Sequence, residues 1–385
     1  MHHGIQKLLL LGAGHAHLHV LASLARQRPA DLDVTLLTPY PHQTYSGMTP
    51  GFVAGHYSED EGRIALEPLV RAAGVRWVQG RCSGIDAGTR TVQVSAAQGM
   101  PGVPASLSYH LLSIDTGATL DRTRLETDMP GAATHALAIR PIEAFTALWP
   151  QVMAMARRQP VSLAVVGAGA GGVELVFAAE QAIRRNGQQG ASFTLVTGGQ
   201  EVLAHYSPGV QRRVLHQLKR RGITVLRETC TGIGPQGLQL GSGATLLCDV
   251  PLLAIGAHAP AWLQGSGLAL SDTGQVLVNA FQQSPSHANV FAAGDVCTRA
   301  DRPHAQSGVY AVRAAPVLLH NLRARALGQP LKAFRPQRDY LKLVSLGGQS
   351  AVADKFGLRS GGAWLWRLTR ATASVRFWIC RPTCL

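Results

Sequence analysis

Two stretches decide the fold: Lys7–Arg26, KLLLLGAGHAHLHVLASLAR, and Ser162–Arg185, SLAVVGAGAGGVELVFAAEQAIRR. In each, a short apolar run leads directly into glycines and then into a pattern of helical periodicity, which indicates a strand, a tight turn and a helix. The second stretch has the G-x-G-x-x-G spacing, at Gly167, Gly169 and Gly172. This spacing allows a sharp turn, lets the backbone approach a pyrophosphate, and aims the first amides of the helix at its phosphates.

The segments that follow the two stretches also match each other. DVTLLTP matches SFTLVTGG, AGVRWVQGRCSGID matches RGITVLRETCTGIG, and LLSIDTGA matches PLLAIGA. The offset between the copies falls from 155 residues (Gly12 to Gly167) to 139 residues (Gly117 to Gly256), so the order is kept while the connecting loops shorten. Such an internal repeat predicts an α/β fold with two Rossmann-like dinucleotide-binding units.

Composition limits the classes of protein that fit. The chain has 385 residues, 46% hydrophobic and 15% charged, so it can bury a large core and is neither disordered nor fibrous. The formal net charge of +14 favours an anionic partner, which is a nucleic acid, an acidic membrane surface or a phosphorylated small molecule. The arginines are dispersed rather than clustered with aromatic residues, so we predict no nucleic-acid partner.

The sequence shows no pattern typical of an exported or membrane-spanning chain. The start MHHGIQK lacks the length and cleavage site of a secretory signal, and the most apolar window, 161–183, contains Glu174 and a cluster of glycines. The six cysteines include no C-x-x-C pair, which argues against a disulfide framework and a structural zinc site. Together these features predict a cytoplasmic location.

Each copy departs from the usual dinucleotide pattern. His17 stands where the third glycine belongs in the first copy, so we expect its side chain to push the helix from the strand or to lie beside the ligand. Thr38 and Thr197 replace the acidic residue that usually binds the adenosine ribose, which leaves the choice between NADH and NADPH open. Arg212 and Arg213 could meet a 2′-phosphate, or they could be solvated helix residues.

Further segments resemble a known family. The paired units, LLSIDTGA, LLAIGA and above all NVFAAGDVC at 289–297 resemble the pyridine nucleotide-disulfide oxidoreductase superfamily, flavoproteins with two dinucleotide-binding domains. Within it, GAGHAHLHVL, YSGMTPGFVAGHY, SGVYAVRAAPVLLHNL and YLKLVSLGGQSAVAD are similar to type II NADH dehydrogenase-like proteins, in the branch found fused to selenide, water dikinase. The resemblance covers nearly the whole chain and ends near Leu368.

The resemblance implies FAD as cofactor and NADH or NADPH as co-substrate. It places FAD in a discontinuous domain made of residues 1–140 and 272–330. It places NAD(P)H in a domain inserted between these two parts, at 141–271. The remaining residues, 331–385, form a C-terminal region that we expect to be interfacial or dimerising.

The motifs and the resemblance together predict the binding residues. Asp295 is the most specific FAD residue, and the resemblance points the N-terminus of a helix expected over about 308–325 at the flavin. The loop 45–55 is expected to be a wall of the flavin site, with an ordinary surface turn as the alternative. The predicted FAD residues are Gly12, Gly14, His15, Thr38, Pro50, Gly117, Gly294, Asp295, Ser307, Gly308 and Val309; the predicted NAD(P)H residues are Gly167, Gly169, Gly172, Glu174, Thr197 and Gly256.

Glu174 is the predicted catalytic residue. The resemblance places this glutamate near the nicotinamide and the flavin, where it positions the ring or relays a proton. The alternative is a carboxylate in the first helical turn that favours the helix dipole, worth about 0.3–1 kcal/mol.

Three histidines, His15, His17 and His19, alternate along the first predicted helix. Alternate residues on a helix lie about 200° apart and cannot easily converge on one ion, so we predict no metal site. We expect His15 and His17 to pack against FAD or to hydrogen-bond to its phosphates.

The cysteines argue against a thiol relay. Disulfide reductases of the superfamily have a cysteine pair in the first FAD helix, and that helix has no cysteine here. Cys82 and Cys230 occupy equivalent positions in the two copies and are expected to be structural. Cys297 follows the Gly-Asp pair and is expected near the flavin.

The C-terminal sequence WLWRLTRATASVRFWICRPTCL predicts a helix with one apolar stripe. On a helix, Trp364, Leu365, Leu368, Ala371, Val375, Trp378 and Ile379 share a face, while Arg367, Arg370 and Arg376 lie off it. Such a stripe is typical of an interfacial helix. Type II NADH dehydrogenases dock on membranes through this region, which implies peripheral contact with the inner face of the cell membrane. Packing within the domain or in a homodimer is the alternative.

Three functions remain open at this point. The leading hypothesis is an FAD-dependent oxidoreductase that passes a hydride from NAD(P)H to FAD and then electrons to a quinone-like acceptor. The kinase-fused relatives suggest, as an alternative, NAD(P)H-dependent reduction of a selenium or sulfur compound. A flavin-binding redox sensor with little turnover is a further alternative, because His17, Thr38 and Thr197 depart from the usual pattern.

Overall fold

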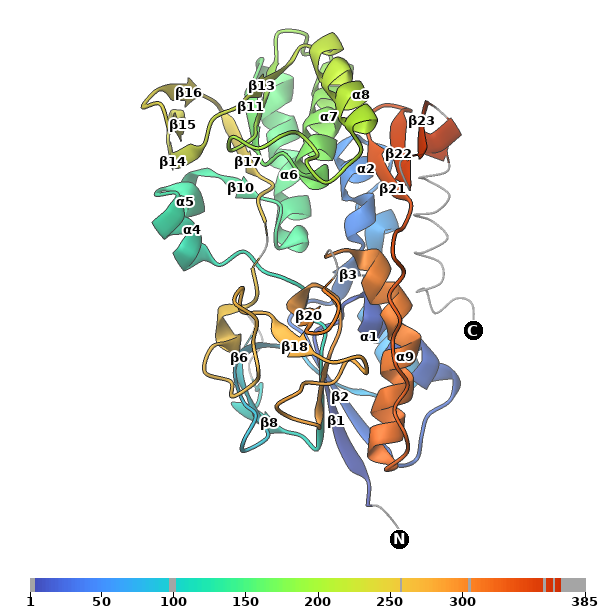
Figure 1. Cartoon of the computed structure of the whole chain (residues 1–385). Helices are drawn as coiled ribbons and strands as arrows, with labels where there is room; N and C mark the ends of the chain where they lie inside the picture. Colours follow the sequence, from blue (N-terminus) through green and yellow to red (C-terminus); the bar gives the residue numbers. More distant parts are fainter. Residues whose placement is uncertain are drawn as a thin grey trace.

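The computed structural model describes residues 4–96, 102–256, 258–303, 306–355, 358–362 and 364–367. It contains two α/β units, each built on a five-stranded parallel sheet, and a small C-terminal sheet (Figure 1). The unit that begins the chain (blue) lies below the second unit (green) in this view. The predicted α/β fold with two Rossmann-like units is confirmed.

The first sheet has the strand order β19-β9-β1-β2-β5. Its strands are β1 (Gln6–Leu11), β2 (Leu32–Leu37), β5 (Arg76–Val78), β9 (Leu111–Ile114) and β19 (Val290–Ala292). All neighbouring strands are parallel, so their carboxyl ends meet at one edge. The four leucines of β1 are buried on both faces of the sheet, as a central parallel strand requires: Leu8 and Leu10 belong to one core cluster, Leu9 and Leu11 to another.

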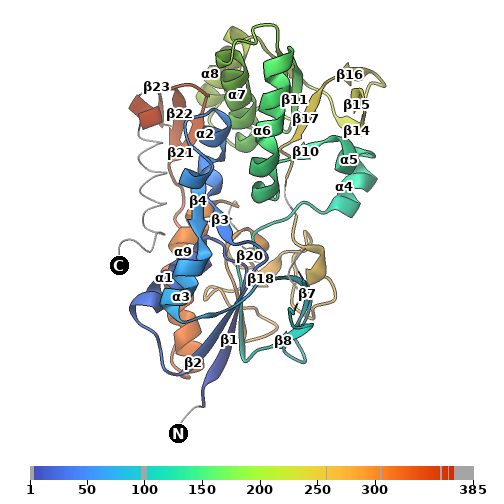
Figure 2. The ribbon, with the colours of Figure 1, turned by 180° about the vertical axis from the view of Figure 1, so that it is seen from behind.

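Helices cover one face of the first sheet. They are α1 (His15–Arg26), α3 (Leu66–Ala73) and α9 (Gly308–Ala326). α1 contacts both α3 and α9, as the view from behind shows (Figure 2), and α9 matches the helix predicted over about 308–325. The opposite face packs on an antiparallel sheet of β6 (Gly80–Asp86), β7 (Thr91–Ala96) and β8 (Ser106–Ser108).

The second sheet has the order β10-β17-β11-β12-β13, and its neighbouring strands are also parallel. The strands are β10 (Leu137–Ala138), β11 (Ser162–Val166), β12 (Ser192–Val196), β13 (Ile223–Leu226) and β17 (Val250–Leu253). Four of them repeat the order β9-β1-β2-β5 of the first sheet, so the two copies in the sequence are two copies in space. The edge strand β10 lies before residue 141, where the sequence placed the start of this unit.

Helices α6 (Ile142–Arg158), α7 (Ala170–Arg185) and α8 (Pro208–Arg220) cover one face of the second sheet. The other face packs on a smaller layer. This layer consists of β14 (Cys230–Gly234), β15 (Gly237–Leu240), β16 (Thr245–Leu247), α4 (Arg122–Asp128) and α5 (Ala132–His135). The remaining short elements are β3 (His42–Thr44), β4 (Arg63–Ala65), β18 (Val276–Val278), β20 (Cys297–Arg299) and the 3-10 turns η1 (Ser46–Met48), η2 (Asp60–Gly62), η3 (Ala261–Leu263) and η4 (Gly294–Val296).

Two segments from outside the second unit complete its core. One is α2 (Thr49–Val53), which contacts α7 and contributes Val53. The other is the C-terminal sheet of β21 (Lys342–Ser345), β22 (Ala351–Lys355) and β23 (Leu358–Gly362), which contributes Val344 and Val352. The prediction of a loop over 45–55 was wrong, because η1 and α2 make most of this segment helical.

The predicted C-terminal apolar stripe is described only in its first turn. Within it Leu365 is buried and Trp364 is exposed, and the stripe from Leu368 onward lies outside the described residues. Within the described ranges, no helix has both the length and the apolar character needed to cross a bilayer.

We expect Gly172→Ala to destabilise the second unit by about 1–3 kcal/mol. A Cβ atom at this position would collide with the carbonyl oxygen of Gly167, which belongs to the backbone and cannot move aside cheaply. Gly171→Ala is the matched control, because a Cβ there meets no atom within 4 Å. Urea denaturation measures both free energies of unfolding. Equal stabilities of the two variants would show that the helix and strand are not packed this closely.

Candidate active site

The two glycine turns have the geometry that a dinucleotide site requires. Gly12 and Gly167 have φ values of +85° and +128°. Their amides each donate a 2.9 Å hydrogen bond to the carbonyl oxygen of the last residue of the adjoining strand, Leu37 of β2 and Val196 of β12. A Cβ on Gly12 would lie 2.6 Å from the carbonyl oxygen of Asp115. The N-cap residues of the helices that follow, Gly14 and Gly169, have no side chain to cap the first turn. In α7 no side-chain cap is formed by that residue, whereas in α1 the side chain of Asp115 takes up two of the first amides.

In the first unit, a buried polar cluster replaces the usual third glycine. The His17 side chain is fully buried, with Nδ1 2.6 Å from the carbonyl oxygen of Gly12 and Nε2 2.8 Å from Oγ of Ser113. A carbonyl can only accept, so Nδ1 carries the proton and Nε2 accepts from the Ser113 hydroxyl. Burial lowers the pKa of His17 to about 4, so the ring stays neutral.

The expectation that His17 contacts FAD was therefore wrong. Both ring nitrogens are used inside the protein, between β1 and β9, and no part of the side chain is exposed. His15 lies elsewhere: its ring packs edge-on against Tyr45, with ring centroids 5.3 Å apart, and lies near Gly308. His17 therefore points into the protein between β1 and β9, whereas His15 points toward Tyr45 and the start of α9.

Asp115, at the end of β9, holds the start of α1. Its Oδ2 accepts hydrogen bonds from the amides of Ala16 at 2.8 Å and His17 at 2.9 Å, and its carbonyl accepts from Gly14 at 3.0 Å. Burial raises the pKa of this carboxyl group to about 8, and the nearby Asp295 adds to the rise, while the two amide hydrogen bonds oppose it.

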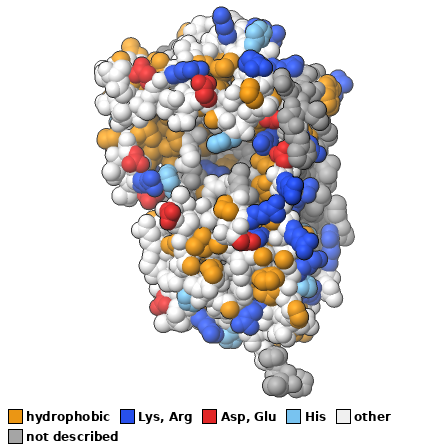
Figure 3. Space-filling view, in the orientation of Figure 1, with side chains coloured by type: hydrophobic (Ala, Val, Ile, Leu, Met, Phe, Trp, Pro, Cys, Tyr) orange, Lys and Arg blue, Asp and Glu red, His pale blue; other side chains and the backbone are white. Residues whose placement is uncertain are grey.

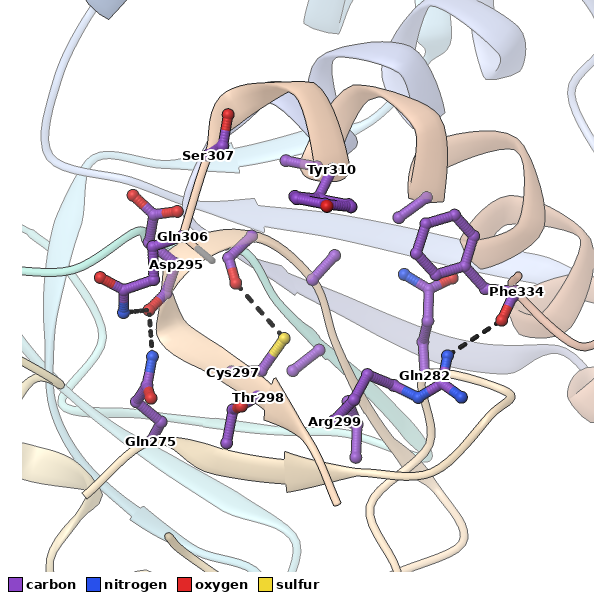
Figure 4. A pocket seen from close by; sticks show the side chains of 16 residues that line it. Gln275, Gln282, Asp295, Cys297, Thr298, Arg299, Gln306, Ser307, Tyr310 and Phe334 are labelled. Carbon is purple, nitrogen blue, oxygen red and sulfur yellow. Dashed lines mark hydrogen bonds between the residues drawn. The ribbon is translucent and has the colours of Figure 1, made fainter. Parts of the chain in front are cut away.

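A cleft of about 830 Å³ lies between the two units and brings predicted residues of both sites together. Pro50 and Asp295 line it from the first unit, and Gly171 and Glu174 line it from the second. Asp295 also lines a second cavity of about 520 Å³ that runs along α9. Figure 4 shows Asp295, Gln306 and Ser307 at one end of this second cavity and Arg299 and Phe334 at the other.

Glu174 lies beyond the first turn of α7, so the helix-dipole alternative does not apply. Its Oε1 accepts a hydrogen bond of 2.8 Å from the amide of Ser345 in β21. Burial raises the pKa of Glu174 to about 7, although this hydrogen bond favours the ionised form. A carboxyl group of this kind can take up or release a proton near neutral pH.

The α9 terminus is partly capped by its own sequence. Oγ of Ser307 accepts a hydrogen bond from the amide of Val309 at 3.3 Å, so a side chain already engages that amide. Near the same end, Nη2 of Arg140 lies 3.4 Å from Oδ2 of Asp295, and the two side chains form an ion pair at the edge of the cleft.

The remaining predicted residues lie at the carboxyl ends of the strands. Thr38 and Thr197 directly follow β2 and β12, and both are buried. Gly117 and Gly256 follow β9 and β17, and a Cβ on either would meet no atom within 4 Å. Arg212 and Arg213 are exposed on α8, as the solvated alternative expects.

A sequence model for pyridine nucleotide-disulphide oxidoreductases matches residues 6–315, which include both glycine turns and the Gly294-Asp295 pair. The chain belongs to this family. Its members are FAD-dependent oxidoreductases that use NADH or NADPH, so the predicted family and its cofactors are confirmed.

Two curated relatives are similar over about half of the chain. A type II NADH:quinone oxidoreductase of Haemophilus influenzae is 29% identical over 216 residues, which is 51% of this chain and 48% of that protein. Ferroptosis suppressor protein 1 of Xenopus tropicalis is 28% identical over 211 residues, 51% of this chain and 54% of that protein. The matched part therefore spans about half the length of these relatives.

Solved structures share the fold over nearly the whole chain. NDH2 of Plasmodium falciparum in complex with NADH has a TM-score of 0.81 at 13% identity and covers 97% of both chains. The sulfide:quinone oxidoreductase of Aquifex aeolicus has a TM-score of 0.77 at 16% identity and covers 98% of this chain and 91% of that chain. At these identities the likeness concerns the fold.

The cysteines of this family member offer no dithiol within the described residues. Cys82, Cys230, Cys248 and Cys297 are all free thiols. Cys82 and Cys230 each donate to the carbonyl oxygen two residues ahead, at Gly84 and Gly232, so their equivalence in the two copies extends to their contacts. Cys297 donates to the carbonyl oxygen of Gly294 at 3.4 Å, and burial raises its pKa well above the usual range.

Several site residues were missed at the level of the sequence. Ser113 and Asp115 could have been found from the repeat, because the second copy has Leu252 and Ala254 at the matching positions. A polar residue in one copy where the other copy has an apolar residue indicates that the two positions have different roles. Arg140 had no such signal, since it lies in the segment that joins the units and reaches the site only through the fold.

We expect His17→Gln to remove part of the pH dependence of stability. The folded pKa of about 4 lies below the usual 6.5, so the neutral ring contributes stability above pH 6.5 that is lost as the pH falls toward 4. Between pH 7.5 and pH 5, the wild-type free energy of unfolding should fall by about 2 kcal/mol more than that of the variant. Urea titrations at both pH values measure this difference, and equal losses would contradict the assignment.

Alkylation checks the thiol of Cys297. Cys297 is partly buried, and burial keeps its thiol protonated at pH 8. Because the thiolate is the reactive form, we expect iodoacetamide to leave Cys297 largely unmodified in the folded protein at pH 8 and to label it after unfolding in guanidinium. Mass spectrometry of the peptide that contains Cys297 gives the extent of labelling. Rapid labelling of the folded chain would contradict this prediction and would indicate a reactive Cys297 thiol beside Gly294.

Proposed function

We propose that this chain is an FAD-dependent NAD(P)H oxidoreductase that passes a hydride from NAD(P)H to FAD and then electrons to a quinone-like acceptor. The observation that supports this most directly is the cleft between the two units, since residues assigned to different dinucleotides line the same space. Glu174 from the second unit and Pro50 and Asp295 from the first are the key members of that lining.

The residues of the first unit fit FAD. Gly12 and Gly14 leave no room for side chains, and Gly117 borders open space at the end of β9, so backbone atoms can approach a pyrophosphate. Asp295 lines the cleft, and α9 begins at Gly308, near the ring of His15. In this proposal, these residues and His15, Thr38, Pro50, Gly294, Ser307 and Val309 hold FAD.

The residues of the second unit fit NAD(P)H. The start of α7 is uncapped at Gly169, and a Cβ there would meet no atom within 4 Å, as is also the case at Gly256. Oγ1 of Thr197 is buried and has no hydrogen-bond partner among the described residues. A ribose hydroxyl placed at this strand end would form a hydrogen bond with Oγ1 of Thr197. Thr197 would then bind the ribose in place of the missing acidic residue.

When bound, FAD supplies the two-electron chemistry between nicotinamide and acceptor. The chain's own task is to orient the two rings in the cleft and to manage protons. Glu174 can hold a proton near neutral pH, and its hydrogen bond from Ser345 fixes the carboxyl group at the cleft wall. Reduction of a quinone consumes protons, so we assign Glu174 as a proton donor in the cleft.

The quinone-like acceptor is supported by the relatives. A type II NADH:quinone oxidoreductase is among the similar curated proteins, and a sulfide:quinone oxidoreductase and an NDH2 share the fold. A persulfide reductase of A. fulgidus also shares it, with a TM-score of 0.73 at 18% identity, so a sulfur or selenium acceptor is the second candidate.

Peripheral membrane contact forms part of the proposal. Exposed basic residues lie along α9 and the segment that follows it: Arg313, Arg325, Lys332, Arg335 and Arg338. Figure 3 shows a cluster of Lys and Arg side chains along this flank. A basic flank favours an anionic lipid surface, which is where a lipid-soluble quinone is found. We propose the inner face of the cell membrane as the location, reached from the cytoplasm.

Anaerobic mixing tests the proposed function. The purified protein should carry FAD, and NADH or NADPH should bleach its visible absorption band; a soluble quinone should then restore the band faster than selenite or a persulfide. A colourless protein would overturn the proposal. Bleaching without reoxidation by any acceptor would favour the redox sensor instead.

We expect Glu174→Gln to lower turnover with a quinone by roughly 10²-fold, the usual contribution of a positioned acid, while FAD binding is unchanged. The matched control is Glu67→Gln on the exposed face of α3, which should turn over like the wild type. Steady-state rates across pH 5–9 measure the effect. Wild-type rates in Glu174→Gln would remove this residue from the mechanism.

A further inference from the structure

The two glycine turns differ at three positions that lie together in space. His17, Ser113 and Asp115 of the first unit stand where the second unit has Gly172, Leu252 and Ala254. The match is structural as well: the amide of Asp115 donates to Leu11, the last residue of β1, and the amide of Ala254 donates to Val166, the last residue of β11. Only the first site therefore has a carboxyl group beneath its glycine turn.

The two oxygens of Asp115 have different surroundings. Oδ2 is satisfied by the amides of Ala16 and His17. Oδ1 lies between the glycine turn and the Gly-Asp turn: a Cβ on Gly14 would lie 2.5 Å from Oδ1, and a Cβ on Gly294 would lie 2.7 Å from it. Among the described residues, no donor forms a hydrogen bond to Oδ1, although Asp115 is only 2% exposed.

No cation compensates this carboxyl group within the described chain. Asp295 of η4 adds a second negative charge, and the ion pair of Arg140 goes to Asp295 rather than to Asp115. The other titratable groups around it are His17 of α1, which is neutral, and Cys297 of β20, which is protonated. A pyrophosphate at the same helix terminus would bring further negative charge to this place.

We propose that Asp115 is a protonated ligand of FAD: Oδ2 holds the start of α1, and Oδ1–H donates a hydrogen bond to an oxygen of the bound dinucleotide. This inference rests on the proposed function, which assigns FAD to the first unit. Binding of FAD is then coupled to the uptake of one proton from solvent at alkaline pH, and release of FAD returns that proton.

Burial supports the same protonation state. It raises the pKa of Asp115 to about 8 in the chain without ligand, and a dianionic pyrophosphate beside the group raises it further. The sign follows from linkage: the form with the higher pKa binds the proton more tightly, so FAD binds best where Asp115 is already protonated. The affinity should be constant below about pH 7.5 and fall toward about tenfold per pH unit above pH 8.

The test follows FAD release from the full-length holoprotein. After dilution, the rise of flavin fluorescence gives the dissociation constant from pH 6.5 to pH 9.5. Calorimetric titration of FAD into the stripped chain at pH 9, in two buffers of different ionisation enthalpy, counts the protons. We expect close to one proton taken up per FAD at pH 9 and a weakening of affinity of about sixfold between pH 8.2 and pH 9.2.

Variants separate Asp115 from other groups. Asp115→Asn keeps an acceptor for the two amides and a permanent donor, so its FAD affinity should not change over this pH range and its proton uptake should vanish. Asp272→Asn, in an exposed loop, is the matched control and should behave like the wild type. If Asp115→Asn fails to fold, the proton count of the wild type decides alone.

Two results would overturn the inference. One is wild-type FAD affinity that stays constant to pH 9.5 with no proton uptake, and the other is an unchanged pH dependence in folded Asp115→Asn. Failure of the proposed function looks different, because FAD would then bind at no pH, and the inference would fall with it.

Discussion

The packing of α2 and the C-terminal sheet into the core of the second unit is the contact on which the rest of the structure depends. Each sheet alone has one edge where the carboxyl ends of its strands and its glycine turn lie in a row, and a site for two dinucleotides needs both of these rows to face each other. Val53 from the first unit and Val344 and Val352 from the C-terminal region are buried with the helices of the second unit, so the orientation of the two rows is fixed by apolar contact. The cleft that contains Glu174 and Asp295 exists because of this arrangement.

The sequence repeat was sufficient to predict much of this architecture. A glycine turn between an apolar run and a helical pattern is a local signal, and it occurs twice with matching segments behind it, so the units, the turns and α9 could be predicted from the sequence. The helical nature of 46–53 could not, because Gly51 and Pro50 read as loop residues, and only packing against α7 makes this segment a helix. The same holds for the contact of Ser345 with Glu174, which joins residues 171 positions apart.

The site was predicted less completely than the fold, and the reason is visible at His17. A side chain in place of a glycine suggests either displacement or a ligand contact, but the hydrogen bonds to Gly12 and Ser113 provide a third outcome that needs knowledge of β9. The two units therefore reach the same turn by different physical means. The second packs backbone on backbone at Gly172, and the first joins helix and strands through a neutral imidazole.

The way the C-terminal sheet completes the second unit also affects how this protein can be divided. A fragment confined to 141–271 would lack the edge strand β10 and leave the apolar surface of α7 uncovered. A minimal nucleotide-binding piece would have to include segments from near both ends of the chain, around Val53 and Val352. Limited proteolysis or split-protein designs should accordingly target exposed loops inside a unit rather than the apparent border between the two.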